Sequence, residues 1–202
     1  MSDLFAAIER LPIAGADVVY YRHFLPRSGA SAMLAGLIDQ VPWRQDNIVL
    51  WGKSVAQPRL TAWYGDPDRS YTYSGLTLQP LPWIDELLLL RTMAEAIAQA
   101  TFNSVLLNYY RDHNDSVGFH SDDEPELGAT PTIGSISLGE TRTLSFKPKR
   151  NKDWQPARIA LESGSLLVMK GDTQRNWRHA IAKESRPCGP RVNLTFRRIL
   201  DG

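Results

Sequence analysis

The sequence predicts an α+β fold in which two antiparallel β-sheets pack face to face and helices cover one outer face. Two segments with helical periodicity, 26–40 and 84–100, come first along the chain. From residue 102 onward, strand-like stretches recur at roughly jelly-roll spacing, with turn signals between them. Helices followed by a run of antiparallel strands are typical of this layered arrangement. With 202 residues, the chain is expected to form a single domain around one substantial core.

Both predicted helices have a face that can be buried. The apolar positions of the helix at 26–40 are Met33, Leu34, Leu37, Ile38 and Val41. This helix ends before Pro42, because a proline ring and its missing N–H do not fit a helix interior. The second helix begins after Pro82, with Asp85 and Glu86 in its first turn, where the helix dipole favours acidic side chains. We expect this helix to have a packing role only.

The strand predictions rest on β-prone residues bounded by turn residues. After the helices they cover residues 102–110, 132–138, 141–148, 157–161, 165–169 and 191–198. Before the helices, residues 17–21 are expected to form one short strand in a mixed N-terminal extension. The basic loop at 147–152 is expected to be a solvated turn, with contact to phosphate as the alternative.

Composition and charge indicate a globular protein outside membranes. The formal net charge is +1, 43% of the residues are hydrophobic, and no run approaches the ~18 to 20 apolar residues of a membrane span. The single Cys188 excludes an internal disulfide. The N-terminus does not resemble a signal peptide. We therefore expect a cytoplasmic monomer with no membrane partner, and any nucleic-acid binding must come from a local basic patch.

Residues 43–82 combine aromatic and basic side chains on short predicted strands. The aromatic residues are Trp43, Trp51, Trp63, Tyr64, Tyr71, Tyr73 and Trp83, and the basic ones are Arg44, Lys53, Arg59 and Arg69. Such a mixture is typical of core packing and also of proteins that stack unpaired bases. For Trp63 and Trp83 we favour the core interpretation, and for the others both remain open.

The stretch Gly118-Phe119-His120-Ser121-Asp122 contains the strongest metal signal. On an extended strand, His120 and Asp122 point to the same face, so both can reach one ion. A distant His179 would complete the ligand set of non-haem Fe(II) oxygenases, two histidines and one carboxylate. The alternative is a surface histidine beside a solvated acid. His23 and His113 fit no such pattern and are expected to be ordinary histidines.

The predicted strand at 191–197 alternates polar and apolar residues without a break. Its polar face carries Arg191, Asn193, Thr195 and Arg197. That face must either line an interior cavity or point to solvent. In a cavity, a guanidinium group would pair bidentately with a carboxylate. Asn108 and Tyr110, on one face of their own strand, would add an amide and a phenol, and the metal ligands leave positions open for a 2-oxo acid and O2.

These motifs, in this order, resemble the AlkB family of Fe(II)/2-oxoglutarate dioxygenases. The motifs are Asn108-Tyr109-Tyr110, His120-Ser121-Asp122-Asp123-Glu124, His179 and the ending Arg191-Val192-Asn193-Leu194-Thr195-Phe196-Arg197. Further matches, including 71–78 and 164–167, are similar to the animal DNA-repair homologues. The resemblance implies a double-stranded β-helix (jelly-roll) core with supporting helices and an N-terminal nucleotide-recognition extension. It divides the single domain into an extension at 1–45, a recognition flap and hairpin at 46–82, and a catalytic core at 102–200.

The resemblance also implies a role for each matching residue. The iron ligands are His120, Asp122 and His179, which with Arg197 form the catalytic set. The 2-oxoglutarate pocket consists of Asn108, Tyr110, Arg191, Asn193, Thr195 and Arg197, with Arg191 on the distal carboxylate. The substrate side consists of Trp51, Lys53, Arg59, Tyr71, Tyr73 and Glu124. Trp51 stands where duplex-acting homologues carry an aromatic that fills the gap left by the flipped base, and packing onto Trp43 or Trp63 is its alternative.

The implied activity is oxidative demethylation of 1-methyladenine and 3-methylcytosine in single- or double-stranded DNA. It uses Fe(II), 2-oxoglutarate and O2 and releases formaldehyde and succinate, as a direct-reversal DNA repair. Bases whose Watson–Crick edge is blocked pair badly and are the easiest to flip. Two alternatives stay open: the same chemistry on RNA or protein, and a non-catalytic metal-binding jelly roll.

Overall fold

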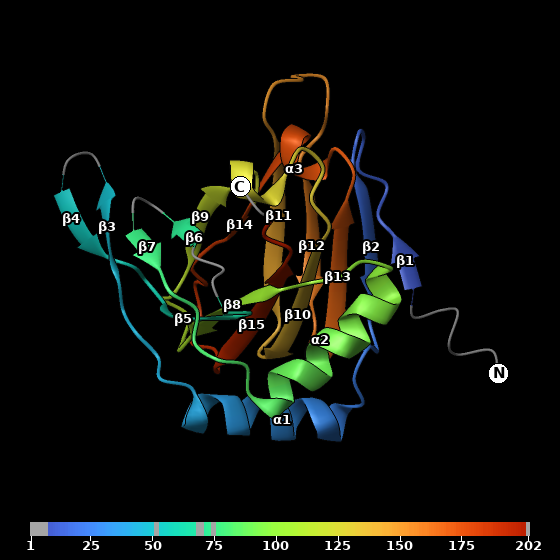
Figure 1. Cartoon of the computed structure of the whole chain (residues 1–202). Coiled ribbons are helices and arrows are strands. Elements are labelled where there is room, and N and C mark those ends of the chain that lie inside the picture. Colours follow the sequence, from blue (N-terminus) through green and yellow to red (C-terminus); the bar gives the residue numbers. More distant parts are fainter. Residues whose placement is uncertain (1–7, 51–52, 68–70, 74–75, 201–202) are drawn as a thin grey trace.

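The computed structural model describes residues 8–50, 53–67, 71–73 and 76–200, and within them two antiparallel sheets form the core (Figure 1). The large sheet consists of β1 (Ile8–Arg10), β2 (Asp17–Tyr21), β5 (Leu60–Gly65), β8 (Ser104–Tyr110), β10 (Ile133–Gly139), β13 (Ser165–Lys170) and β15 (Arg191–Arg197). Their order across the sheet is β1-β2-β13-β10-β15-β8-β5. The small sheet consists of β9 (Val117–His120), β11 (Arg142–Pro148), β12 (Ala157–Leu161) and β14 (Trp177–Ile181), in the order β12-β11-β14-β9. The predicted α+β jelly roll is confirmed.

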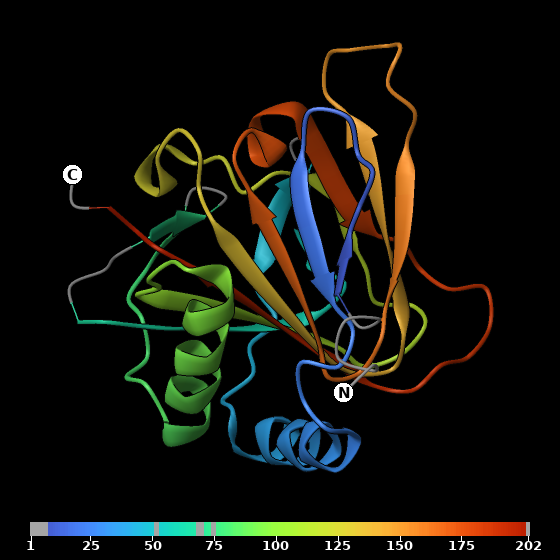
Figure 2. The ribbon, with the colours of Figure 1, turned by 90° about the vertical axis from the view of Figure 1, so that its right-hand side faces the viewer.

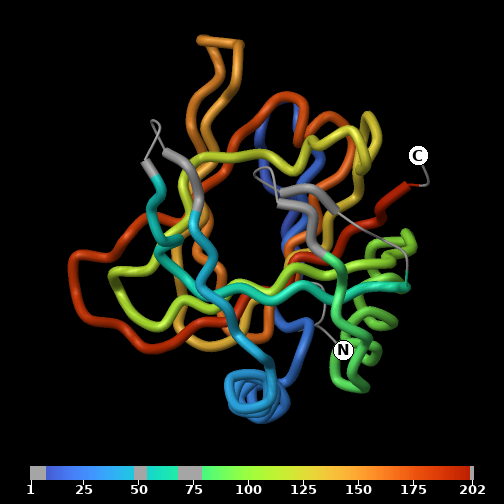
Figure 3. The backbone as a smooth tube through the Cα atoms, turned by 60° about the vertical axis from the view of Figure 1, so that its left-hand side comes forward, coloured from blue at the N-terminus to red at the C-terminus, as the bar shows by residue number. Residues whose placement is uncertain are grey.

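Helices and hairpins surround this pair of sheets. The helices α1 (Arg27–Gln40) and α2 (Asp85–Ala98) cover the outer face of the large sheet, with β11 and β12 on the other side (Figure 2). The short α3 (Thr173–Asn176) precedes β14, and a 3-10 turn spans Pro125–Leu127. Two hairpins, β3 (Asn47–Leu50) with β4 (Lys53–Ala56) and β6 (Tyr71–Tyr73) with β7 (Leu76–Leu78), lie next to each other beside β9 (Figures 1 and 3).

Alternating side chains on the large sheet build the two larger apolar clusters, one on each face. On β13, Leu166 and Val168 pack toward the helices, whereas Leu167 and Met169 pack between the two sheets. On β15, the helix-facing residues are Val192, Leu194 and Phe196, all fully buried. Both faces of the large sheet are therefore covered, one by helices and one by the small sheet.

The other face of β15 lies in the interior. Arg191, Asn193, Thr195 and Arg197 are 1%, 8%, 8% and 3% exposed. The interpretation of this face as solvent-exposed is therefore wrong. Because β15 is a central strand between β10 and β8, its polar residues meet those of its neighbours, and Asn193 pairs with Asn108 in register.

A close backbone approach at the end of β10 requires glycine. Gly139 lies opposite Arg191 in the β10–β15 pair and has a φ of +91°. A Cβ atom at this position would lie 2.3 Å from the Pro190 carbonyl oxygen. Only glycine allows this φ without strain and leaves room for the chain that leads into Arg191.

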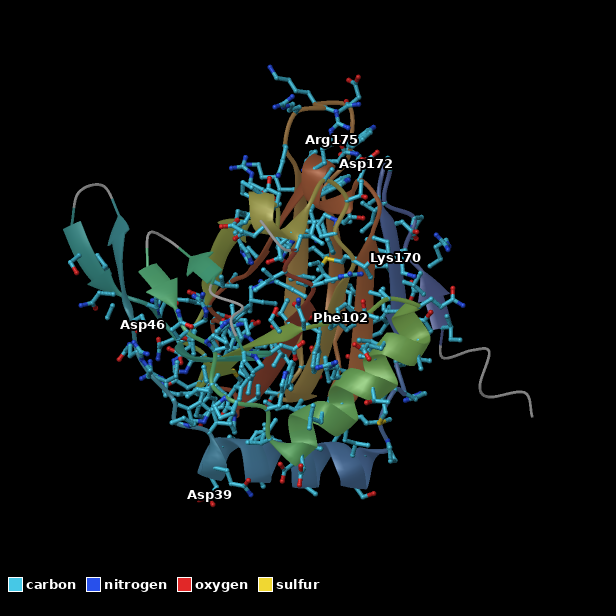
Figure 4. All side chains as sticks on the ribbon, viewed as in Figure 1. Asp39, Asp46, Phe102, Lys170, Asp172 and Arg175 are labelled. Atoms are coloured by element: carbon cyan, nitrogen blue, oxygen red, sulfur yellow. The ribbon has the colours of Figure 1, made fainter. Side chains whose placement is uncertain are left out.

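The helix ends follow the expected signals. Val41 is extended at the end of α1, before Pro42, and Gln99 ends α2 in the left-handed region with a φ of 51°. Lys170 donates to the Ala98 carbonyl oxygen at the end of α2, where a cation satisfies an unpaired acceptor (Figure 4). Trp63 is buried and Trp83 packs against the helix-side cluster, so both belong to the core as predicted.

Parts of the N-terminal third also belong to the sheets. The strands β2 and β5 are members of the large sheet, β2 beside β13 and β5 at the edge beside β8. The division at residues 45 and 82 stays a prediction. Within the described ranges, no helix is long and apolar enough to cross a membrane.

Candidate active site

Three predicted metal ligands converge between the sheets. His120 ends β9, Asp122 follows two residues later, and His179 lies on β14 directly opposite His120 in the β9–β14 pair. One ligand atom from each lies within 4.8 Å of the others. Asp122 and His179 are 2% and 5% exposed, and His120 is half-buried. This burial contradicts a solvated surface pair, and the arrangement fits one ion shared by two histidines and a carboxylate.

Hydrogen bonds orient these ligands. His120 Nδ1 lies 2.9 Å from the Gly118 carbonyl oxygen. That carbonyl can only accept, so Nδ1 carries the proton and Nε2 keeps a lone pair for a metal. The Asp122 amide donates to Oε1 of buried Gln174 over 3.0 Å, and the Ser121 hydroxyl donates to the Trp177 carbonyl oxygen over 2.8 Å. The segment that carries Asp122 is thus fastened to α3 and to the start of β14.

Charges around Asp122 keep both buried ligands in their metal-binding forms. Burial works to raise the pKa of Asp122, but positive charge from Arg197 and the two histidines outweighs it, so the pKa lies below its ordinary value. Burial and the neighbouring His120 lower the pKa of His179 to about 3. At neutral pH Asp122 is therefore an anion and His179 a neutral imidazole, as metal coordination requires.

The polar atoms here fit a bound cation. The Nε2 atom of His179 lies 3.6 Å from Oδ2 of Asp122. Among the described residues, that buried Oδ2 accepts no hydrogen bond, while Oδ1 accepts one from Arg197. A buried carboxylate oxygen without a donor is costly, and a metal ion between the three ligands would satisfy it.

A row of polar side chains continues from the metal ligands along the inner face of the large sheet. Together with the metal ligands, the residues Asn108, Tyr110, Arg191, Asn193, Thr195 and Arg197 line one cavity. Asn193 donates to the Ser135 hydroxyl over 2.8 Å, and the Thr195 hydroxyl donates to Oδ1 of Asn193 over 3.1 Å. The predicted cosubstrate residues are thus brought together with the triad.

The surroundings of Arg191 fit the binding of an anion. Its guanidinium group donates to the Ser137 hydroxyl over 2.9 Å and lies 5.1 Å from the ring centre of Tyr110. Its Nε and Nη1 atoms are buried and find no hydrogen-bond acceptor in the part of the chain that the structure describes. Burial lowers the pKa of Arg191, yet a guanidinium group stays charged. A buried cation with vacant donors matches one carboxylate of 2-oxoglutarate.

Of the six predicted substrate residues, the structure describes the side chains of Arg59 and Glu124 only. Arg59 is buried in the same cavity and donates to Oδ1 of Asn108 over 2.6 Å, so it adjoins the cosubstrate row. Glu124 is half-buried, and its Oε2 atom is buried without a hydrogen-bond donor among the described residues. Trp51 lies outside the described residues. Lys53 belongs to β4, Tyr71 and Tyr73 belong to β6, and the side chains of these three also lie outside the described structure.

Several residues of the site were not identified from the sequence. Ser135 and Ser137 stand on an alternating strand, β10, and their pattern was the one available hint. Gln174 supports Asp122 from a short helix that no periodicity predicts. A second pocket beside β5 is lined by Trp43, Trp63, Leu106 and seven further residues that include Asp46, on the hairpin side of the molecule (Figure 4).

Comparisons with known proteins agree with this geometry. A family model described as the 2OG-Fe(II) oxygenase superfamily matches residues 17–197. The chain is 42% identical over 196 residues to alpha-ketoglutarate-dependent dioxygenase alkB homolog 3 of Mus musculus, covering 93% of this chain and 68% of the relative. It is 41% identical over 159 residues to DNA oxidative demethylase ALKBH2 of Homo sapiens, covering 76% of this chain and 61% of that protein.

A solved structure gives the same fold. The structure of OsALKBH1 aligns with a TM-score of 0.64 at 19% identity, covering 95% of this chain and 99% of that one. At this identity the likeness concerns the fold alone. The curated relatives are longer than this chain, which spans about two thirds of the mouse protein's length.

Proposed function

This chain belongs to the AlkB family within the 2OG-Fe(II) oxygenase superfamily, and from that premise we propose that it oxidatively demethylates N-alkylated bases in DNA, 1-methyladenine and 3-methylcytosine among them. As a family member it is an Fe(II)- and 2-oxoglutarate-dependent dioxygenase. This membership argues against the non-catalytic alternative. The observation that carries the proposal is the single cavity that joins this cluster to a buried arginine with vacant donors.

Each part of the cavity has a proposed task. When bound, Fe(II) with 2-oxoglutarate and O2 supplies the oxidation of an N-methyl carbon, and formaldehyde, succinate and CO2 leave. His120, Asp122 and His179 would hold the metal, and Arg197 fixes Asp122 by donating to its Oδ1. Arg191 would hold the distal carboxylate of 2-oxoglutarate. The apolar side chains of Leu144, Leu161 and Ile181 line the cavity and exclude water.

The outer face of the small sheet carries exposed positive charges, which support the proposal of a polyanionic substrate. Lys147 on β11 lies directly opposite Arg178 on β14, and Arg158 on neighbouring β12 also points outward; all three are exposed. Among the described residues, none of the three forms a salt bridge. Like charges opposite each other destabilise a sheet, so such a pair is better explained by a phosphate backbone that neutralises it. Phe119, 48% exposed next to His120, offers a ring on which a base can stack.

The test is a mass measurement on defined substrates. Protein, Fe(II), 2-oxoglutarate and air are incubated with a DNA oligonucleotide that contains one 1-methyladenine. We expect the oligonucleotide to lose the mass of one methylene, with succinate formed in equal amount. The same sequence without the methyl group, and a reaction without 2-oxoglutarate, serve as controls.

The RNA and protein alternatives are separated by competition. Methylated RNA of the same sequence, and a methylated peptide, compete against the methylated DNA in one reaction. The proposal requires DNA to be demethylated fastest. Demethylation of RNA alone would instead identify the same chemistry with an RNA substrate, and succinate formation with no change in any oligonucleotide would contradict a nucleic-acid substrate.

A further inference from the structure

The end of the cavity that holds Tyr110 and Arg191 borders on another buried arginine, Arg142, to which the proposed function gives no role. Arg142 is the first residue of β11, and its side chain has 0% exposure. It is not among the residues that line the cavity. Burying an arginine is costly unless its N–H groups form hydrogen bonds. Those of Arg142 bond acceptors in parts of the chain that are far apart in sequence.

The guanidinium group of Arg142 joins two loops. Its Nη2 atom donates to the Asp115 carbonyl oxygen over 2.9 Å and to the Ala182 carbonyl oxygen over 2.5 Å, and its Nε atom donates to Oε1 of Glu184 over 3.3 Å. The first acceptor lies in the turn between β8 and β9, and the other two follow β14. The Glu184 amide also donates to the His113 carbonyl oxygen over 2.9 Å. Arg142 therefore ties the two loops together through its hydrogen bonds.

The same group lies against the aromatic ring that faces the cosubstrate arginine. The Cζ atom of Arg142 is 5.6 Å from the ring centre of Tyr110, and the Cζ atom of Arg191 is 5.1 Å from that ring centre. Tyr110 and Arg191 are also direct partners in the β8–β15 register. Both cations lie within the range of cation–π attraction, so the ring of Tyr110 is held from Arg142 as well as from Arg191.

At this end of the cavity, Arg191 has no carboxylate partner among the described residues. Among the described residues, Arg142 bonds one carboxylate, that of Glu184, which is 40% exposed, and no carboxylate bonds Arg191. Two buried cations near one ring repel each other. An incoming carboxylate on Arg191 would relieve this repulsion and would favour the arrangement in which Arg142 joins the two loops.

We propose that Arg142 is a positioning residue for 2-oxoglutarate, acting through Tyr110 and through the two loops that it joins. This inference rests on the proposed role of Arg191 as the group that binds the distal carboxylate. It has a reciprocal consequence: if the tethered loops strengthen 2-oxoglutarate binding, then bound 2-oxoglutarate must stabilise the loops by the same factor.

The first test uses the wild-type protein loaded with Mn(II) and no nucleic acid. Amide hydrogen exchange is measured with and without saturating 2-oxoglutarate. We expect slower exchange at the Glu184 amide, which bonds His113 between the loops, and no change at the Val41 amide, which bonds Leu37 at the end of α1. Unchanged exchange at Glu184 would overturn the proposal, and this measurement does not depend on any variant folding.

The second test compares two matched arginine variants of the same region. Arg142→Lys keeps the charge but loses the fork that reaches both loops. Arg111→Lys loosens the same turn, because Arg111 donates to Asp115 over 2.8 Å, but no described contact links Arg111 to the 182–184 loop. Calorimetry on the Mn(II)-loaded proteins gives the Kd for 2-oxoglutarate. We expect about a tenfold weaker Kd for Arg142→Lys, typical of coupling between sites, and a near wild-type value for Arg111→Lys.

Two readouts separate positioning from mere stability. Arg142→Lys should keep its Mn(II) affinity, and its kcat should recover at saturating 2-oxoglutarate. A variant that melts earlier but keeps the wild-type Kd would show a purely structural role and would end the proposal. Because the Kd is measured without nucleic acid, failure of the demethylation assay leaves this result unaffected. An unchanged Kd in Arg191→Lys would instead locate the fault in the assumed carboxylate site.

Discussion

Arg191 illustrates how a single side chain gains its function from burial. The residue is 1% exposed, and its guanidinium group donates to the neutral hydroxyl of Ser137, while Nε and Nη1 stay without acceptors among the described residues. In water these donors would be solvated at no cost. Inside the cavity, donors without acceptors are costly, and in the proposed function a carboxylate of 2-oxoglutarate would satisfy them.

The first prediction follows for Arg191→Lys. A lysine keeps the charge but presents one ammonium group in place of the planar fork. We expect the KM for 2-oxoglutarate to rise by about tenfold to a hundredfold, as for loss of a charged hydrogen bond of ~1.5 to 3 kcal/mol. Steady-state kinetics with varied 2-oxoglutarate measure it, with exposed Arg158→Lys as the matched control. An unchanged KM would remove Arg191 from the carboxylate site.

Asp115 gives a residue-scale prediction about pH. Burial works to raise its pKa, but hydrogen bonds from the Arg111 side chain and amide outweigh burial, so the folded-state pKa is lowered. The folded chain therefore prefers the ionised form. The stability that Asp115 contributes is fully present above its ordinary pKa of 3.8 and is lost as pH falls through the lower folded-state value.

Asp115→Asn should accordingly be less stable than wild type by about 2 kcal/mol at pH 7, since it loses charged hydrogen bonds. This difference should stay constant down to about pH 5 and shrink below about pH 4, where wild type protonates its own carboxyl. Urea unfolding at a series of pH values measures it, with exposed Asp153→Asn as the control. A difference of the same size at pH 3 would contradict the argument.

At the scale of elements, most strands after residue 102 were predicted from runs of β-prone residues bounded by turn residues. The strand β15 alternates without a break, and its polar face was identified from that pattern alone. The strand β9 was expected only as the extended segment around His120 and Asp122, because four residues are too few to show a pattern, and Asp122 lies beyond its end. The strand β14 is buried at four of five positions and reads like any apolar segment.

The residues of the candidate site also differ in how far they could be predicted from the sequence. The metal ligands and Arg191 stand in dense motifs, so their convergence in one cavity could be predicted, and the role of Arg191 stays a proposal. Arg142 and Gln174 could not be predicted, because each acts through a partner more than 30 residues away in sequence, as with Ala182 and Asp122. No local pattern marks such a residue. The hairpins raise the opposite difficulty: their aromatic residues are conspicuous in the sequence, but Trp51 lies outside the described structure.

The small sheet yields an element-scale prediction about salt. Lys147→Gln and Arg178→Gln each remove one exposed positive charge from its outer face. We expect weaker binding to methylated single-stranded DNA and a slope of log K against log salt that is smaller by about 0.7 for each charge removed. Fluorescence anisotropy at several salt concentrations measures this slope.

The control for that experiment is Arg27→Gln, because Arg27 is equally exposed but begins α1 on the helix side of the molecule. Lys147→Gln should not lower the melting temperature, since it relieves the repulsion from Arg178. An equal loss of binding in Arg27→Gln would mean that only the overall charge matters, and the outer face would have no special part.

For the whole molecule, the cavity is the place where the two sheets meet. His120 and His179 come from the small sheet, whereas Arg191, Asn193 and Arg197 come from β15 of the large sheet. One hydrogen bond, from Arg197 to Asp122, already links the two sides. A metal ion and 2-oxoglutarate bound together would add further links, so ligand binding and the packing of the sheets are coupled.

The last prediction is therefore that Mn(II) with 2-oxoglutarate stabilises the entire fold. A ligand at 100 times its Kd raises the free energy of unfolding by about 2.7 kcal/mol, if it binds the folded state alone. His120→Ala should lose most of this gain yet keep its fold, because His120 is only half-buried and its described hydrogen bond is to nearby Gly118. His113→Ala, equally half-buried but outside the triad, should keep the full gain. Urea unfolding with and without the two ligands measures all three proteins. Equal gains in both variants would show that the stabilising metal binds somewhere other than the triad, and a gain unaffected by chelation would show that no metal is involved.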